Sequence, residues 1–232
     1  MTRFVTVALW TIALSTVLGC AESVTTSCTG CPELRVVHSA VSVPAVDVLL
    51  NDEVQVEGLA VGMVSSYIAL APGEWAVGFR PSGSTTDPPP TMMSFAAGDR
   101  VTVLTVDSST VINPWVLSDT NAAVPANRSK LRAVHFAEHA APIDIWRTQP
   151  DFGQYITFQF PIRPREATPY MESDPGDWRV LVSTETRDSG GIPVLADTLL
   201  ETAPIPVPAG QTRTVLILDR EGGGVTAVVI VP

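Results

Sequence analysis

Hydrophobic residues along the chain fall in short runs that alternate with polar residues, and turn-forming residues separate the runs. In the first half these runs predict strands near residues 33–39, 45–50, 54–59, 65–70, 75–80, 91–95, 100–106 and 111–117. Asn51-Asp52 lies between two runs and predicts a tight hairpin turn. No long helical periodicity follows the first twenty residues, so the pattern predicts an all-β chain.

Part of the pattern occurs twice. Six of the fifteen residues from Leu34 to Val48 are identical to those 97 positions later, against about one expected by chance. A Pro-Gly-acid-Trp segment ending at Trp75 also recurs, ending at Trp178. Strands every eight to twelve residues, separated by turns, are typical of sandwiches. We predict two tandem immunoglobulin-like antiparallel β-sandwich domains, at residues 33–118 and 130–232.

The first twenty residues have the pattern of an export signal. Arg3 precedes an uncharged, mostly apolar stretch that is too short for a comfortable membrane span. Val17-Leu18-Gly19-Cys20 resembles the bacterial lipobox, in which the chain is cut before the cysteine and the cysteine is acylated. We predict a signal peptide at 1–19, a lipid-modified Cys20 and a tether over 20–32. The alternative is an ordinary signal peptide followed by a free cysteine.

Lipid attachment would make the membrane a partner and place the protein in the cell envelope. Each buried methylene contributes about 0.8 kcal/mol, so several acyl chains anchor a domain stably. Ala21 follows the cysteine, and the resemblance to lipoprotein sorting signals implies the outer membrane in a Gram-negative cell. The formal charge of −10 and the lack of basic runs argue against nucleic acid as a partner.

Two further cysteines, Cys28 and Cys31, lie in the predicted tether. Export would place them in an oxidising compartment, which favours a small disulfide loop. A metal or redox pair is the alternative, although no further ligands have the spacing of a zinc site.

The repeated segments also carry a family resemblance. Leu34 to His38, followed by Val43-Pro44-Ala45-Val46-Asp47-Val48, resembles the opening motif of the bacterial domain of unknown function 4397, and a similar segment begins at Leu131. Trp75 and Trp178 stand where that family usually has Tyr. The resemblance covers residues 33–231 and implies an exported, often lipid-anchored β-sandwich module. It implies no catalytic residues, and we predict no cofactor.

Two repeated polar residues are candidates for chemistry. If the first two strands of each repeat form a hairpin, His38 lies opposite Asp47, and His135 opposite Asp144. Such a pair is half of a catalytic triad. Because both repeats carry it, we favour a structural hydrogen bond that fixes the loop over residues 40–44.

Residues His135 to His139 match H-x-x-E-H, an inverted zinc-protease motif. That motif requires a helix, and here it begins on a predicted strand, so we predict no metal site. The repeated Trp75 and Trp178 are predicted to lie in the core. Trp146, Tyr155 and Tyr170 occur only in the second repeat and are the candidates for ligand-binding aromatics.

The sequence therefore predicts a lipid-anchored envelope protein with a non-enzymatic binding, adhesion or structural role. The alternatives are an accessory module that binds a glycan or a small ligand and, less favoured, a zinc hydrolase that uses His135, Glu138 and His139. A protein or glycan partner is expected, but the sequence does not identify it.

Overall fold

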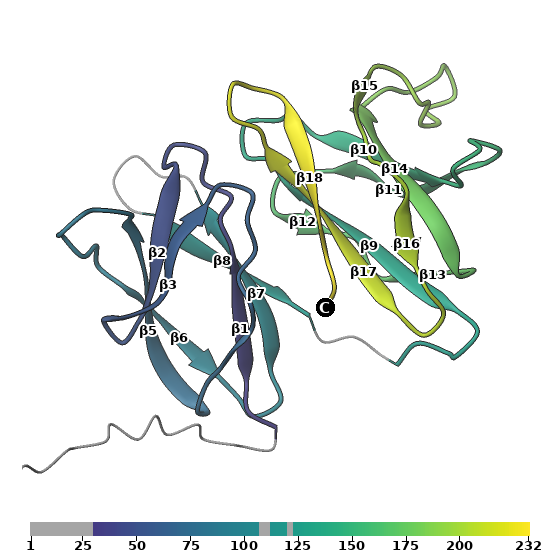
Figure 1. Ribbon diagram of the computed structural model, residues 1–232. Helices are drawn as coiled ribbons and strands as arrows, with labels where there is room; N and C mark the ends of the chain where they lie inside the picture. Colours follow the sequence, from purple (N-terminus) through teal and green to yellow (C-terminus); the bar gives the residue numbers. More distant parts are fainter. Residues whose placement is uncertain (1–29, 107–111, 120–122) are drawn as a thin grey trace, which may run out of the picture.

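A computed structural model describes residues 30–106, 112–119 and 123–232 of the chain (Figure 1). These residues form strands, turns and loops and contain no helix, so the all-β prediction is confirmed. The strands of the amino-terminal half are β1 (Glu33–Val37), β2 (Ala45–Leu50), β3 (Glu53–Ala60), β4 (Ile68–Ala69), β5 (Gly73–Pro81), β6 (Thr91–Phe95), β7 (Arg100–Val106) and β8 (Asn113–Ser118).

The carboxy-terminal half begins after a connection that ends at residue 128. Its strands are β9 (Ser129–Phe136), β10 (Ile143–Thr148), β11 (Tyr155–Ile162), β12 (Glu166–Ala167), β13 (Met171–Ser173), β14 (Gly176–Thr184), β15 (Thr198–Glu201), β16 (Ile205–Val207), β17 (Thr212–Asp219) and β18 (Val225–Ile230).

Each half contains two sheets, and the strand orders of the two halves correspond. The first half has the orders β4-β1-β7-β8 and β3-β2-β5-β6, and the second has β12-β9-β17-β18 and β11-β10-β14-β15, with β13 and β16 as additional edge strands. Most neighbouring strands are antiparallel, but β1 runs parallel to β7 and β9 runs parallel to β17. The sheets that contain β1 and β9 are therefore mixed, and the other sheet of each half is antiparallel. The immunoglobulin-like assignment and the tandem-domain boundaries stay predictions.

An apolar core fills the space between the two sheets of each half. In the first half Leu34 and Val36 of β1 pack with Val48 of β2 and Phe79 of β5. In the second half the corresponding strands contribute Leu131, Ile145 and Val180, together with Trp178. Trp178 is a buried core residue, as predicted, whereas Trp75 is partly buried and packs against the first core.

The predicted hairpin turn at Asn51-Asp52 joins β2 to β3. Both residues have positive φ, 50° and 66°, as a type I′ turn requires. Asn51 Oδ1 accepts a hydrogen bond from the backbone N–H of Ala76, 3.0 Å away, which ties the turn to β5. The turn thereby holds β2 between β3 and β5.

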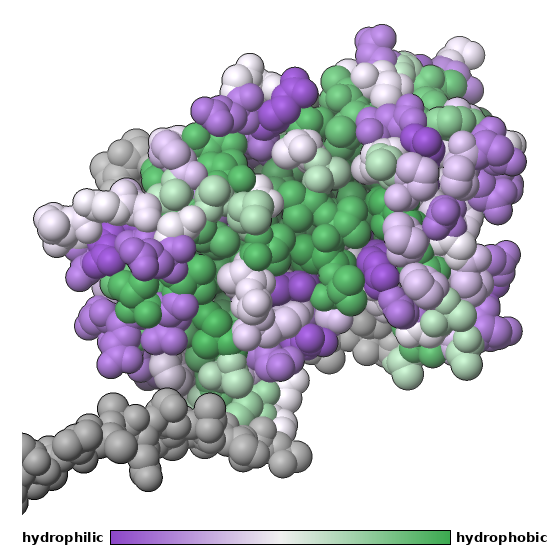
Figure 2. Space-filling model, viewed as in Figure 1, coloured by the Kyte–Doolittle hydropathy of each residue, from purple (hydrophilic) through white to green (hydrophobic). Residues whose placement is uncertain are grey.

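A third apolar cluster lies between the halves. The sheet β4-β1-β7-β8 contributes Val37 and Leu104, and the sheet β12-β9-β17-β18 contributes Phe136 and Leu216. Strand β9 is buried along its whole length, because one face packs in its own half and the other packs on the first half. Trp115 and Phe136 meet across this junction with ring centroids 5.1 Å apart. Apolar side chains also gather on the molecular surface over the junction (Figure 2).

The predictions for the amino-terminal segment fall largely outside this description. The signal peptide, Cys20 and Cys28 lie outside the described residues. Cys31 is disulfide-bonded, and its predicted pairing with Cys28 stays a prediction. None of the residues that the structure describes form a helix with the length and apolarity that a membrane span requires.

Candidate functional site

A buried polar cluster lies at the junction between the halves, centred on Asp119. Its carboxylate is fully buried and accepts hydrogen bonds from Arg35 Nη2 and Arg132 Nη2, each 3.2 Å away. Arg35 belongs to β1 and Arg132 to the corresponding strand β9, so one acid joins equivalent strands of the two halves. This arrangement fixes the halves relative to each other, because breaking a buried ion pair costs about 3–5 kcal/mol.

The residues around Asp119 also correspond between the halves. Arg35 Nε donates to Thr102 Oγ1 at 2.7 Å, and Arg132 Nε donates to Thr214 Oγ1 at 2.9 Å. Each guanidinium stacks on a tyrosine, Arg35 on Tyr67 and Arg132 on Tyr170. Burial, together with the hydrogen bond that its hydroxyl donates to Asp119, raises the pKa of Tyr67, so the phenol stays protonated. The cluster is therefore a structural joint.

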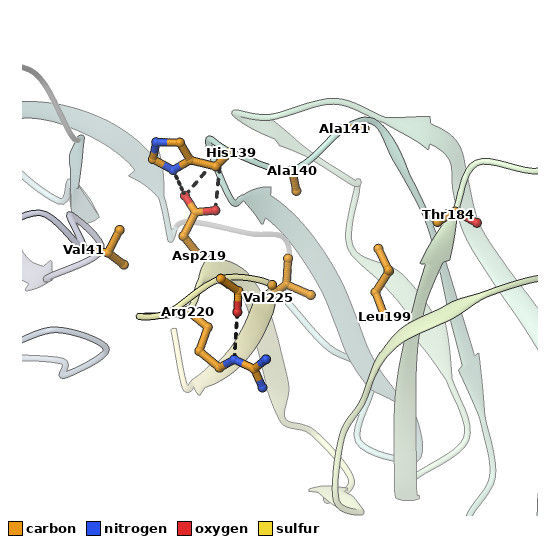
Figure 3. Close-up of a pocket in the computed structure, with 12 residues that line it drawn as sticks. Val41, His139, Ala140, Ala141, Thr184, Leu199, Asp219, Arg220 and Val225 are labelled. Carbon is orange, nitrogen blue, oxygen red and sulfur yellow. Dashed lines mark hydrogen bonds and ion pairs between the residues drawn. The ribbon is translucent and has the colours of Figure 1, made fainter.

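A cavity of about 530 Å³ opens at the ends of strands β14, β15, β17 and β18 (Figure 3). This volume lies within the range of small-molecule sites, about 300–1,000 Å³. The first half contributes one lining residue, and the second half contributes the loops that follow β9 and β17. The lining residues are Val41, His139, Ala140, Ala141, Thr184, Leu199, Asp219, Arg220, Gly222, Gly223, Gly224 and Val225.

Asp219 shapes one side of the cavity by holding the loop after β9. Its carboxylate accepts hydrogen bonds from the backbone N–H of Glu138, at 2.8 Å, and from His139 Nδ1, at 3.1 Å. The Asp219 side chain is only 8% exposed, whereas that of His139 is 69% exposed. Asp219 is therefore engaged by this loop, and the imidazole is left at the rim.

The glycine run shapes another side of the cavity. Gly222, Gly223 and Gly224 all have positive φ, between 80° and 104°, which other residues adopt with strain. Arg220 lies along this turn, with its Nε donating to the carbonyl of Gly223 at 3.0 Å. A Cβ at residue 224 would lie 3.1 Å from Arg220 Nη2, so glycine there leaves room for the guanidinium.

The predicted pairing of His38 with Asp47 is wrong. Strands β1 and β2 belong to different sheets, because β1 pairs with β4 and β7 while β2 pairs with β3 and β5. His38 instead hydrogen-bonds Thr105 Oγ1, at 2.9 Å, and the carbonyl of Val43, at 2.7 Å. The histidine does fix the loop before β2, as predicted, but through Thr105 and Val43 and not through Asp47.

Asp47 has a separate structural role at the edge of its sheet. Hydrogen bonds from the Ser82 hydroxyl and the Gly58 N–H, together with Arg80, hold the pKa of its carboxyl below the ordinary value. In the second half Asp144 pairs with Arg187 at 2.6 Å, and His135 bonds the carbonyl of Ala141 at 3.2 Å. The two histidines and the two aspartates thus form two sets of loop-fixing contacts.

This opening segment matches a known family. The family model described as Domain of unknown function (DUF4397) matches residues 32–146, from just before β1 to within β10. The predicted resemblance to this family is therefore confirmed over residues 32–146. Beyond residue 146 the resemblance rests on the repeated motifs alone. The chain matches no curated protein.

The H-x-x-E-H segment begins on β9, at the end of the matched region. His135 is buried, Glu138 forms a two-pronged ion pair with Arg165, and His139 bonds Asp219. The three side chains therefore have separate partners. Within the described ranges, no group of three or more His, Cys, Asp and Glu side chains is placed to hold a metal ion.

The aromatic residues proposed for ligand binding are not brought together on one exposed face. Trp146 is only 7% exposed, and its Nε1 donates to Ser183 Oγ inside the second half. Tyr170 belongs to the Asp119 joint, where its hydroxyl lies 3.1 Å from Thr214 Oγ1. Tyr155 is exposed, next to Phe152, with the ring centroids 6.5 Å apart. The predicted aromatic site is therefore wrong for Trp146 and Tyr170.

Sequence reasoning missed both the joint and the cavity. Asp119 lies at the end of the first repeat and has no counterpart in the repeated motifs. The available signal was the recurrence of Arg35 as Arg132, a charged residue within a buried apolar strand. For the cavity the signal was the run of three glycines directly after β17.

Proposed function

We propose that this chain is an exported, lipid-anchored protein of the cell envelope that has a non-enzymatic binding role, and that the cavity lined by Val41 and the second half is its ligand site. One observation carries the binding role: a cavity of small-molecule size, open to solvent and lined mainly by apolar residues. The joint supports it, because halves fixed to each other keep Val41 beside the loops of the second half.

Anchoring rests on the sequence. Cys20 follows a segment with the features of a lipoprotein signal, and β1 begins at Glu33. The twelve residues between them span at most about 40 Å when extended, so the first half would lie close to the membrane. The acidic composition makes direct docking on anionic lipid unfavourable. Stable attachment to the membrane would therefore depend on the lipid anchor.

The anchor is tested by fractionating cells that express the wild-type chain or Cys20→Ala, with protease treatment of intact cells. We expect the wild type in the membrane fraction and Cys20→Ala in the soluble fraction. Cys28→Ala is the control, because it removes a nearby cysteine outside the lipobox and should stay membrane-bound. Membrane attachment of Cys20→Ala equal to wild type would refute the anchor. Protease sensitivity of the wild type would indicate surface display, and protection would indicate a periplasm-facing role.

The binding role is tested with an uncharged apolar fluorophore, N-phenyl-1-naphthylamine. We expect saturable fluorescence enhancement with the purified protein, and its loss in Ala141→Trp, which fills the cavity from an exposed position. Ala97→Trp places the same side chain at an exposed turn that does not line the cavity, and should bind like wild type. Absence of saturable binding, or equal binding by Ala141→Trp, would refute the cavity as the ligand site.

Glycan binding is a second candidate function, favoured by the exposed pair Phe152 and Tyr155. The guanidinium of Arg179 lies over the Phe152 ring, 5.2 Å from its centroid, so the pair has a defined orientation. Sedimentation with purified peptidoglycan sacculi tests this candidate: co-sedimentation that Tyr155→Ala abolishes would support it, and retention by Tyr155→Ala would exclude it.

A further inference from the structure

We infer that the cavity selects a ligand with an apolar body and one carboxylate, and that Arg220 is the partner of that carboxylate. This inference rests on the proposed binding role and adds the chemical class of the ligand. It depends on three properties of the cavity. Its apolar wall is partly exposed to water, its guanidinium forms no ion pair with a described residue, and its aspartate already accepts hydrogen bonds from the loop after β9.

The apolar wall is formed by Val41, Ala140, Ala141, Leu199 and Val225. Leu199 is 45% exposed although it is a large apolar side chain on β15. In the close-up it lies near Ala140 and Val225 around the same open space (Figure 3). An apolar ligand in this space would remove the Leu199 side chain from water, and burying apolar area contributes about 25 cal/mol per Å².

Arg220 differs from most arginines of this protein. Eight other arginines have a carboxylate oxygen within 4 Å, as expected in a chain with an excess of acids. Arg220 forms no ion pair with any residue that the structure describes, and its side chain donates through Nε to the Gly223 carbonyl. That bond orients the guanidinium and leaves both terminal nitrogens for a ligand.

Asp219 does not neutralise this guanidinium. Its carboxylate turns toward His139 and the loop after β9, on the other side of the chain from the Arg220 side chain (Figure 3). Arg220 is the one arginine or lysine among the lining residues. Its positive charge is therefore available to a ligand, because the Asp219 carboxylate is bonded to the loop after β9.

The charge of the ligand follows from a single guanidinium. An arginine matches a carboxylate through two parallel N–H···O bonds, and one positive charge balances one carboxylate. A phosphate monoester carries about −1.5 to −2 at neutral pH and needs further cations, which the lining residues do not supply. An amphipathic monocarboxylate fits the wall and the charge together.

The test displaces bound N-phenyl-1-naphthylamine with decanoate or with decan-1-ol, which share a chain length and differ in the headgroup. We expect decanoate to displace the fluorophore from the wild type at about tenfold lower concentration than decan-1-ol, since a charged hydrogen bond contributes about 1.5–3 kcal/mol. In Arg220→Gln this difference should vanish while the fluorophore still binds. Arg163→Gln removes an exposed arginine outside the cavity lining and should keep the difference.

Two results would overturn the carboxylate inference. One is displacement of the wild-type complex by decan-1-ol at the same or lower concentration than decanoate. The other is an unchanged decanoate preference in Arg220→Gln. In both cases saturable fluorophore binding that Ala141→Trp abolishes would still support the binding role. If the fluorophore does not bind at all, the proposed function itself fails.

Discussion

At the scale of single residues, the molecule depends most on Asp119, which serves two arginines from different halves. A carboxylate that accepts bonds from Arg35, Arg132, Thr102 and Tyr67 leaves no buried donor of the joint without a partner. The same four donors would face a neutral amide if Asp119 were replaced by Asn. Two guanidiniums would then be buried without a counter-charge.

We therefore expect Asp119→Asn to lower the free energy of unfolding by about 3–5 kcal/mol, the cost of breaking a buried ion pair. Urea denaturation followed by tryptophan fluorescence measures the change. Asp87→Asn is the matched control, because Asp87 pairs with Arg80 at the surface and exposed pairs contribute about 0–1 kcal/mol. A loss at residue 119 no larger than at residue 87 would show that the cluster does not stabilise the joint.

His135 gives the protein a defined response to acid. Nδ1 accepts a hydrogen bond from the Ala137 N–H, so the proton of the neutral ring is on Nε2, which donates to the Ala141 carbonyl. Burial lowers the pKa of His135 below its ordinary value of 6.5. The unfolded chain therefore binds a proton more readily than the folded chain.

The sign follows from linkage: stability falls as the pH drops through 6.5 and continues to fall until it reaches the lowered folded pKa. We expect the urea midpoint of the wild type to decrease between pH 7.5 and 5.5, and that of His135→Gln to change less. His139→Gln alters a largely exposed imidazole and should retain the wild-type dependence. An equal pH dependence in wild type and His135→Gln would assign the effect to other groups.

At the scale of strands, the sequence predicted which residues form elements better than it predicted which elements pair. The expected strands at 45–50, 91–95 and 100–106 coincide with β2, β6 and β7, because alternation and turn residues are local signals. The parallel partner of β1 is β7, whose residues lie 67 positions away, and no local signal specifies that pairing. The error over His38 and Asp47 arose from assuming that successive strands form a hairpin.

The burial of Trp146 was also predictable in part. It lies 97 residues after Leu49, which is buried in the first half, and the same repeat spacing that relates His38 to His135 relates these two positions. Treating Trp146 as specific to the second half overlooked that correspondence. The cavity lay beyond sequence reasoning, because its walls come from five segments that are joined only by the tertiary fold.

Strand β17 offers a direct test of its two apolar faces. Leu216 packs in the cluster between the halves, and its neighbour Ile217 packs in the core of the second half. We expect Leu216→Ala and Ile217→Ala each to reduce stability by about 2–5 kcal/mol. Only Leu216→Ala should speed tryptic cleavage after Arg128 under native conditions, because it loosens the contact between the halves.

Equal cleavage rates in the two variants would mean that the apolar cluster does not hold the halves together. The free energies of unfolding, measured in parallel, establish that the two substitutions are comparable in severity. The comparison then depends on the face of the strand and not on overall stability.

At the scale of the whole molecule, the two halves bury apolar surface against each other. The first half is therefore not expected to remain monomeric when it is separated from the second. A fragment of residues 30–119 would expose Val37, Leu104, Val106 and Leu117. We expect this fragment to elute from a size-exclusion column at an apparent mass above that of one chain. Residues 30–232 should elute at the mass of one chain. Leu104→Lys in the fragment should reduce the association. A monomeric wild-type fragment would contradict a large apolar junction.

The joint also distinguishes this chain, which carries both halves, from a symmetric dimer of identical halves. Arg132 donates to the carbonyl of Ser118, and Arg35 donates to that of Val231, so each arginine reaches the last strand region of the opposite half. The strand registers make Ser118 and Val231 equivalent, and the residue after each is Asp119 in one case and Pro232 in the other. Suppose instead that two identical subunits met here, related by a two-fold axis. They would bring either two carboxylates or none to the centre of the joint. One acid shared by two arginines requires two halves that differ at this position, so here the chain is no longer interchangeable with a symmetric dimer of identical subunits.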